Sequence, residues 1–371
     1  MKARLITFHT PKNYGAVLQA YSLMKHLQSK GLDVEVIDYN TERLRKAYPI
    51  IPKPNGVKDL IRTILLIPTY GKKREKYKKF EQFVSKKLRL TKRFESVKEL
   101  SEYPWDEGTL FVTGSDQVFN PNRIFEERRA FYLDFVPENF YKFSYAGSFG
   151  VSSIDKGFVE EAKGYLSKFN KISVREKSGV DIVNDVIGTL PTEVLDPVFL
   201  NDKEFWVKNI ENNKIVDSPY VLYYRLMNSK SADKFAMETA KKLNKKLVVI
   251  TDGFVSNLKS AKILRNVGPD DFLTLYNGAD YVLTDSFHGI AFSIIFEKDF
   301  CFCDFSTRTN DRGLNLIKKL QLQENVLVDG KCYGKTIDYV KVKEVLNGFK
   351  QQAFSFIDNA IQEADHFKRE N

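Results

Sequence analysis

Residues 284–289, TDSFHG, place three side chains that can do chemistry within a few positions of one another: Asp285, Ser286 and His288. The apolar run ADYVL precedes them and IAFSIIF follows, which predicts a loop between a buried strand and a helix. Unpaired N–H groups at a helix N-terminus attract anions, and a histidine there can exchange a proton with a substrate. The alternative is structural: Asp285 or Ser286 caps the helix and His288 packs.

A second polar loop, TGSDQVFNP at residues 113–121, follows an apolar strand pattern. Gly114 lets a ligand approach the backbone, and Asp116, between Ser115 and Gln117, can accept a proton or orient a hydroxyl group. The alternative is an Asx turn followed by an Asn-Pro turn.

A third loop presents Asn13, Tyr14 and Gly15 directly before a helical pattern. It can hold an anion or the polar edge of a sugar, with the Tyr14 ring as a stacking face. An Asn cap with an ordinary turn glycine is the alternative.

Two arginines follow expected strands, Arg175 after KISV and Arg225 after VLYY. Arginine binds carboxylates and phosphates through paired hydrogen bonds, so these positions predict a substrate with such groups. A structural ion pair, such as Arg175 with Glu176, is the alternative. Arg308 and Arg312, in the polar segment STRTNDRG, are candidates to close over a ligand.

The elements that must position these loops alternate between strand and helix. A strand at 3–8, a helix at 16–31 and a strand at 32–39 open the series, and a second series starts at residue 220. The pattern predicts two Rossmann-like α/β domains, 1–214 and 215–335, and a long amphipathic helix in 336–371 that crosses back to the first domain. Ligands of parallel sheets bind at the carboxyl ends of the strands, so we expect the loops to face a cleft between the domains.

Several function classes are disfavoured. The chain has no GxGxxG, GxxxxGK[ST], GxSxG or HExxH motif, which argues against common nucleotide cofactors, α/β-hydrolase chemistry and a zinc hydrolase. No apolar run approaches the roughly 20 residues of a membrane span, and the N-terminus is unlike a signal peptide. We expect a cytoplasmic protein.

The net charge of +10 is concentrated between residues 58 and 93, which hold 13 Lys/Arg and 3 Asp/Glu. A nucleic-acid-binding protein more often spreads its charge over a face of the fold, so we expect no nucleic-acid partner. A basic helix can rest on an anionic membrane, and a solvated charged face is the alternative.

Taken together, these stretches resemble the polysaccharide pyruvyl transferase family. The matching segments run in order up to about residue 320: NYGAVLQAYSL at 13–23, TGSDQVFNP at 113–121, SYAGSFG at 144–150, ISVREKSG at 172–179, LDPVFL at 195–200 and ADYVLTDSFHG at 279–289. The resemblance implies a GT-B-like fold and an enzyme of capsular, cell-wall-associated or exopolysaccharide biosynthesis. It implies transfer of the carbon skeleton of phosphoenolpyruvate onto two sugar hydroxyls, giving a cyclic pyruvate ketal and phosphate.

By the same resemblance, His288 and Arg175 interact with phosphoenolpyruvate, and Asp116 corresponds to the acidic residue of the family's GSD turn. We expect His288 to act as the acid and Asp116 as the base, with phosphoenolpyruvate as co-substrate, no metal and no other cofactor. Some relatives have Arg-Leu-His at 286–288, so a phosphate-binding arginine is missing here. Arg225, Arg308 or Arg312 are candidates to replace it.

The acceptor in such pathways is often built on a lipid diphosphate at the inner membrane face, which gives the basic segment 58–93 a purpose as a peripheral membrane contact. Two other functions fit the same pattern. One is a GT-B glycosyltransferase that uses a nucleotide sugar, and the other is a non-catalytic module that binds polysaccharide or its assembly partners.

Overall fold

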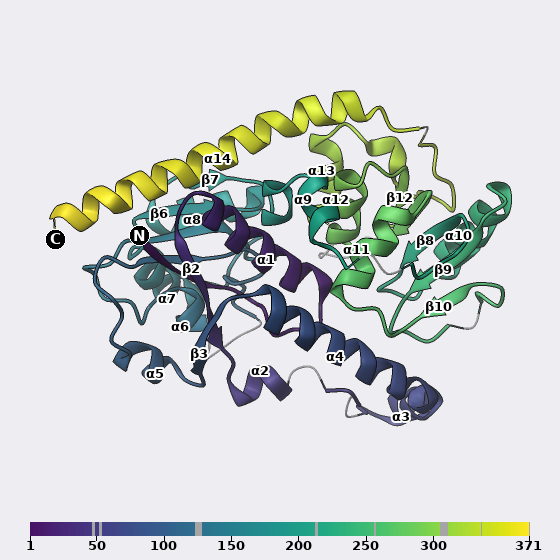
Figure 1. Ribbon diagram of the computed structural model, residues 1–371, viewed down its shortest axis with the longest axis horizontal. Helices are drawn as coiled ribbons and strands as arrows, with labels where there is room; N and C mark the ends of the chain where they lie inside the picture. Colours follow the sequence, from purple (N-terminus) through teal and green to yellow (C-terminus); the bar gives the residue numbers. More distant parts are fainter. Residues whose placement is uncertain are drawn as a thin grey trace. The chain divides into compact units, whose positions relative to one another are not determined.

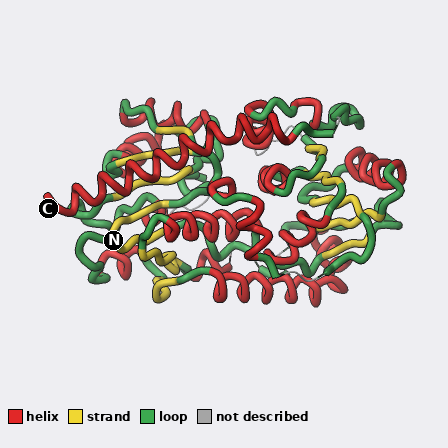
Figure 2. The backbone as a smooth tube through the Cα atoms, turned by 45° about the horizontal axis from the view of Figure 1, so that its top comes forward, coloured by secondary structure: helices red, strands yellow, loops and turns green. Residues whose placement is uncertain are grey.

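The computed structural model describes residues 1–46, 49–51, 54–122, 128–211, 214–255, 257–304, 311–334 and 336–370. The chain forms two compact units, and each is built from more than one segment. Unit 1 comprises Met1–Ala47, Val84–Asn201 and Asn347–Asn371, and unit 2 comprises Tyr48–Phe83 and Asp202–Leu346. Figure 2 shows strands with helices on either side within each unit. The expected class, two Rossmann-like α/β halves, is confirmed.

Unit 1 contains a seven-stranded parallel sheet in the order β3-β2-β1-β4-β5-β6-β7. The chain builds outward from β1 through β2 to β3, and then builds the other half from β4, so the order reverses between β1 and β4. Ligands of such sheets bind in the crevice outside the carboxyl ends of the strands at this reversal. The strands are β1 (Lys2–Ile6), β2 (Asp33–Tyr39), β3 (Leu90–Phe94), β4 (Leu110–Thr113), β5 (Lys142–Gly147), β6 (Lys171–Val174) and β7 (Thr192–Glu193).

The central strands β4 and β5 of unit 1 are buried along their whole length because both faces of the sheet are covered. Such burial is expected for a parallel sheet between helices. The helices of this unit are α1 (Tyr14–Ser29), α2 (Glu42–Lys46), α5 (Val97–Glu102), α6 (Arg128–Phe131), α7 (Lys156–Leu166), α8 (Lys177–Ile187), η2 (Pro197–Leu200) and the later part of α14 (Tyr339–Glu370).

Unit 2 repeats the plan with a five-stranded sheet in the order β10-β9-β8-β11-β12. Its order reverses between β8 and β11, so the loops after these two strands flank its expected ligand crevice. The strands are β8 (Tyr220–Tyr224), β9 (Lys246–Ile250), β10 (Lys262–Leu264), β11 (Tyr281–Thr284) and β12 (Phe300–Phe302). The other elements, labelled in Figure 1 where there is room, are α3 (Val57–Leu66), η1 (Ile67–Thr69), α4 (Tyr70–Lys87), α9 (Lys203–Asn209), α10 (Lys230–Lys242), α11 (Pro269–Gly278), α12 (Phe287–Ile295), α13 (Asp311–Lys319) and η3 (Gln323–Asn325).

The division of the chain differs from the expected ranges at three places. Unit 2 takes over from Asp202 instead of residue 215, it also includes residues 48–83, and it runs to Leu346 instead of residue 335. Ion pairs explain the second difference, because Lys76 bonds Asp252 at 2.6 Å and Lys79 bonds Asp271 at 2.7 Å. The helix α4 is therefore tied to unit 2 over most of its length.

The C-terminal helix α14 begins in unit 2, and from Asn347 onward it belongs to unit 1. There the rings of His26 and Phe354 stack at 5.1 Å between centroids, and Phe356 contacts Phe143. No helix in the described part of the chain has the length and apolar character of a membrane span.

Candidate active site

The first loop of unit 1, after β1, is held by a helix cap. The Asn13 side chain accepts a hydrogen bond from the Gly15 amide at 2.9 Å and caps α1. Asn13 is exposed, whereas Tyr14 is only 2% exposed. The Tyr14 ring therefore lies in the core and does not offer a stacking face in this structure.

The second loop, after β4, lies on the other side of the strand-order reversal. A Cβ on Gly114 would meet the Thr7 Cβ at 2.9 Å, so glycine allows the two loops to approach closely. The Thr7 hydroxyl bonds the Ser115 carbonyl at 2.8 Å, and the Gln117 side chain accepts from Asn120 at 3.1 Å. These contacts fix the loop at the position where a ligand is expected.

Asp116 is the exception in this loop, because among residues 111–120 it alone is not buried. Its backbone has a positive φ of 74°, which aspartate and asparagine tolerate better than most residues. The carboxylate accepts one hydrogen bond, from the Gln117 amide at 2.9 Å. The geometry therefore leaves carboxylate acceptor capacity at the carboxyl edge of the sheet.

Arg175, after β6, is embedded in carboxylates. Its Nη1 lies 2.7 Å from Asp196 and its Nε lies 3.6 Å from Glu176. Burial lowers the pKa of the guanidinium, but the charges of Asp196, Glu176 and Asp116 outweigh it and leave the pKa above its usual value. The structural ion pair with Glu176 that the sequence offered as the alternative is thus present, with Asp196 as a stronger partner.

This ion-pair network joins several strand-end loops. Glu176 accepts from the Ser148 hydroxyl at 2.7 Å and from the Phe149 amide at 3.0 Å, both after β5. Asp196, after β7, also accepts from Ser115 at 3.4 Å. The loops after β4, β5, β6 and β7 are therefore held as one polar edge around Arg175.

Sequence reasoning missed a buried pair at the same edge, formed by His9 and Asp38. The His9 ring contacts the Asp38 carboxylate at 3.1 Å through Nε2 and the Thr7 carbonyl at 3.2 Å through Nδ1. Burial raises the pKa of Asp38, but the hydrogen bond with His9 and the charge of Arg93 bring it below its usual value. The sequence contains the pattern that could have identified His9, since it lies in the loop after a strand, as the other candidates do.

In unit 2, Arg225 after β8 is also used internally. Its Nε and Nη2 bind the two carboxylate oxygens of Asp233 at 2.8 and 3.1 Å, and Nη1 donates to the Phe254 carbonyl at 3.3 Å. Both side chains of the pair are buried. Arg225 therefore ties β8 to α10 and to the loop after β9.

Asp285, after β11, bridges the reversal in unit 2. Its carboxylate accepts from the Leu226 amide at 2.9 Å and from the Met227 amide at 2.7 Å. Burial raises the pKa of Asp285 to about 6, against the opposing effect of these backbone hydrogen bonds and of Arg225. Asp285 thus clamps the loop after β8 to the loop after β11.

The start of α12 presents the remaining two candidates. Ser286 occupies the N-cap position, but its side chain makes no capping hydrogen bond. His288 lies in the first turn, half-buried, with its ring edge-on to Phe287. A Cβ on Gly289 would lie 1.9 Å from the Thr284 hydroxyl oxygen, so only glycine lets α12 start this close to β11. A histidine and a helix N-terminus are thereby brought together.

Arg312 lies half-buried in α13, while Arg308 lies outside the described residues. In the described ranges, no group of three or more His, Cys, Asp or Glu side chains is arranged to hold a metal ion.

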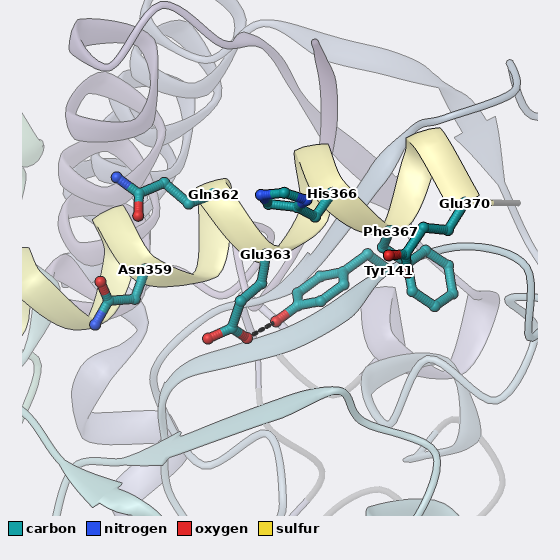
Figure 3. A pocket seen from close by; sticks show the side chains of 7 residues that line it. All are labelled: Tyr141, Asn359, Gln362, Glu363, His366, Phe367 and Glu370. Atoms are coloured by element: carbon teal, nitrogen blue, oxygen red, sulfur yellow. Dashed lines mark hydrogen bonds between the residues drawn. The ribbon is translucent and has the colours of Figure 1, made fainter.

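A cavity of about 380 Å³ in unit 1 lies along the end of α14 (Figure 3). In it the Tyr141 hydroxyl donates to Glu363, which also pairs with Lys171. This cavity contains none of the predicted site residues. Its lining residues are Tyr141, Asn359, Gln362, Glu363, His366, Phe367 and Glu370.

Solved structures with a similar backbone include two sugar-nucleotide enzymes. A candidate UDP-N-acetylglucosamine 2-epimerase from Listeria monocytogenes is 10% identical, covers 99% of this chain and 97% of its own, and gives a TM-score of 0.50. UDP-GlcNAc 2-epimerase from Neisseria meningitidis, bound to UDP-GlcNAc, is 10% identical with full coverage of both chains and a TM-score of 0.49. At such identity the likeness to the Listeria structure shows the fold alone.

The comparison with curated proteins finds no match. The comparison with family models finds one that covers residues 13–306, under the description polysaccharide pyruvyl transferase. That range takes in the strand-end loops of both sheets, from the cap of α1 to the start of α12. The chain therefore belongs to the polysaccharide pyruvyl transferase family.

Proposed function

We propose that the protein is a phosphoenolpyruvate-dependent transferase that forms a cyclic pyruvate ketal on a sugar of a polysaccharide or of a lipid-linked oligosaccharide. The observation that carries the proposal is the start of α12, where His288 stands in the first turn of a helix whose N-cap side chain makes no capping bond. Together with the family match, this arrangement suits a small anion that needs a proton donor.

We assign the binding of phosphoenolpyruvate, the donor substrate, to unit 2. Phosphoenolpyruvate carries a carboxylate and a phosphate, so its site needs cations and amide donors for both. The first amides of α12 and the Ser286 hydroxyl supply part of them. We assign the replacement for the missing loop arginine to Arg225, Arg308 or Arg312, of which Arg225 also donates to Asp233 and to Phe254.

We assign the acceptor to unit 1, with Asp116 as the base because its carboxylate is the partly exposed one in its loop. The resemblance gives Arg175 a role in handling phosphoenolpyruvate, but because its guanidinium is buried between Asp196 and Glu176 we assign it a positioning role in this scheme. Its ion pairs with Asp196 and Glu176 order the sheet edge that carries Asp116. The positive charge of Arg175 also interacts with the Asp116 carboxylate.

The proposed reaction balances without an additional reactant. His288 gives a proton to the methylene carbon of phosphoenolpyruvate, and the first sugar hydroxyl forms a bond to C2 while Asp116 accepts its proton. The bond between C2 and the phosphate oxygen breaks, the second hydroxyl closes the ring, and its proton leaves with the phosphate. Asp116 and His288 then return to their starting states by proton exchange with solvent. Each proton transfer contributes on the order of 10²–10⁴ in rate.

The direct test incubates the protein with phosphoenolpyruvate and candidate nitrophenyl or lipid-linked sugars, and follows phosphate release and the pyruvyl adduct by mass spectrometry. The His288→Ala variant should lose turnover while keeping its fold. A matched control is His366→Ala, which removes an exposed histidine on α14. An active His288→Ala enzyme would exclude His288 from the mechanism. Thermal stabilisation by nucleotide sugars but not by phosphoenolpyruvate would instead support a glycosyltransferase, and no turnover with any acceptor would support a binding module.

We also propose that residues 58–93 contact the anionic cytoplasmic face of a membrane, where a lipid-diphosphate-linked acceptor would be found. Part of the charge in this segment has another task, since Lys76 and Lys79 pair with acidic residues and Lys73 donates to the Ile50 carbonyl at 2.7 Å. The exposed Lys72 and Lys78 are the cations that we assign to the membrane.

A further inference from the structure

Helix α3 exposes large aliphatic side chains along one face. Leu60, Ile61, Ile64 and Leu65 are each between 47% and 55% exposed, and their spacing places them on the same side of the helix. Ile67, in η1 directly after α3, is 55% exposed and extends this aliphatic face. Soluble proteins rarely expose such a contiguous apolar surface without a binding purpose.

The segment that follows the aliphatic face lines a cavity of about 310 Å³ in unit 2. Pro68 and Thr69 of η1 and Lys72 of α4 form one wall, so the cavity continues directly from the aliphatic face along the chain. In Figure 1, α3 lies at the N-terminal end of α4. The rest of the wall comes from the segment between β9 and β10, from β10 itself and from the residue directly after it, through Val255, Leu258, Lys259, Ala261, Ile263 and Arg265.

The charge of this cavity is positive. Lys72, Lys259 and Arg265 line it, and its described lining includes no Asp or Glu. Arg265 is held in place because Nη1 donates to the Gly253 carbonyl at 2.8 Å and to the Thr251 carbonyl at 3.2 Å. Asp252, whose charge acts on Arg265, is engaged by Lys76. A cationic cavity with apolar walls fits a phosphate ester attached to an apolar chain.

We propose that α3 inserts its aliphatic face into an anionic bilayer and that the adjoining cavity binds the phosphate group of a lipid in that bilayer. The inference rests on the membrane contact proposed above and not on the transfer reaction. Charge selects this occupant over a second copy of the chain, because two copies would bring together the same basic segment and repel one another.

The aliphatic face is tested by vesicle sedimentation with the full chain. Vesicles are phosphatidylcholine alone or phosphatidylcholine with phosphatidic acid. The triple variant I61S/I64S/L65S should bind the anionic vesicles at least tenfold more weakly than the natural chain. The matched control L190S/V328S/V340S removes three aliphatic side chains elsewhere that are at least as exposed and should bind as the natural chain does. Equal binding by the two triple variants, or no binding by the natural chain, overturns the proposal.

The cavity is tested with two pairs of charge changes. The variant K72Q/K259Q should lose about twenty-five-fold in affinity for the phosphatidic acid vesicles, since each lysine near an anionic surface is worth about fivefold. The control K241Q/K242Q makes the same charge change on exposed residues of α10 and should lose much less. An equal loss of vesicle affinity in the two double variants would mean that net charge alone causes the binding, and it would overturn the proposal that the cavity binds a lipid phosphate.

Competition identifies the source of the phosphate. Soluble dihexanoyl phosphatidic acid should displace the protein from vesicles at concentrations at which inorganic phosphate does not, and equal displacement by inorganic phosphate overturns the lipid assignment. A dimer that the I61S/I64S/L65S variant abolishes would assign the aliphatic face to self-association instead. Turnover of a soluble nitrophenyl acceptor should not change in this variant, so failure of the membrane proposal is distinguishable from failure of the proposed reaction.

Discussion

Single side chains at the carboxyl ends of the strands carry the chemistry proposed for this protein, and Asp116 gives the clearest case. It stands where a rigid loop leaves one carboxylate partly exposed, and its backbone lies in the left-handed region at a φ of 74°. Asparagine tolerates this conformation as aspartate does. The backbone requirement and the chemical requirement at this position can therefore be separated by mutation.

The Asp116→Asn variant should keep the loop and lose the base. We expect turnover to fall by about 10²–10⁴ with an unchanged midpoint of thermal unfolding, measured by phosphate release and by calorimetry. The Asp116→Ala variant should lose turnover and also about 1 kcal/mol of stability, because alanine is strained at a positive φ. An Asp116→Asn enzyme with normal turnover would show that the base is a different group.

The residues also show what the sequence can and cannot predict. Loops after strands were found because parallel strands end at one edge of a sheet. The partners within that edge were not found, since Asp196 lies 21 positions from Arg175 and Asp38 lies 29 positions from His9. Local patterns carry no information on such distant pairs, and they cannot tell that the Tyr14 ring turns inward.

At the scale of elements, the junction of β11 with α12 sets the position of His288. Gly289 has no room for a side chain, because an added Cβ would lie 1.9 Å from the Thr284 hydroxyl oxygen and 2.7 Å from its Cβ. The helix can start only where this contact allows. The orientation of His288 therefore depends on a residue that has no side chain of its own.

The Gly289→Ala variant should be destabilised by about 1–3 kcal/mol through overpacking and should lose turnover as α12 moves away from β11. Gly164, in α7, is the matched control because nothing lies within 4 Å of its added Cβ. The Gly164→Ala variant should be as stable as the natural chain or up to about 1 kcal/mol more stable, from its better helix propensity. Urea unfolding and phosphate release measure the two effects, and equal behaviour of the two variants would contradict this account.

The elements themselves were predicted best where hydrophobic periodicity and tertiary burial agree, as in α1 and β4. The periodicity of α3 shows the limit of this reasoning. An apolar stripe at helical spacing is the usual sign of a face packed on the core, yet in α3 this face is exposed. In contrast, Phe80 and Phe83 in the charged helix α4 are buried. Whether an apolar helix face is buried depends on what the rest of the fold packs against it, and the sequence of the helix alone does not show this.

At the scale of the whole molecule, one buried group in each unit links stability to pH, and the two groups act in opposite directions. In unit 1, burial and nearby Lys30 lower the pKa of His26 to about 4. Between pH 6.5 and 4 the unfolded chain binds a proton at His26 that the folded chain does not, so the titration of His26 lowers stability as the pH falls. In unit 2, Asp285 has a pKa of about 6 when folded, so the folded chain takes up this proton first and the titration of Asp285 raises stability as the pH falls.

Two variants separate these effects. Between pH 7 and 5 the His26→Phe variant, which keeps a ring against Phe354, should lose about 1–2 kcal/mol less stability than the natural chain. The Asp285→Asn variant should lose about 1–2 kcal/mol more over the same interval, because it has no carboxylate to protonate. Urea unfolding at the two pH values measures both changes. Parallel pH profiles for all three proteins would exclude both groups as the cause.

The path of the chain through its two units bears on how the protein is made. Unit 1 takes its last segment from Asn347 onward, and Ala353, Phe356, Ile357, Ala360 and Ala364 of that segment are buried. When the ribosome has synthesised the first sheet, it has therefore not yet synthesised the helix that covers it. The first sheet must wait for the segment from Asn347 onward. Deleting residues 347–371 should leave the product insoluble or bound to chaperones in expression trials, and a soluble, cooperatively melting fragment 1–346 would show that the first sheet matures without this helix.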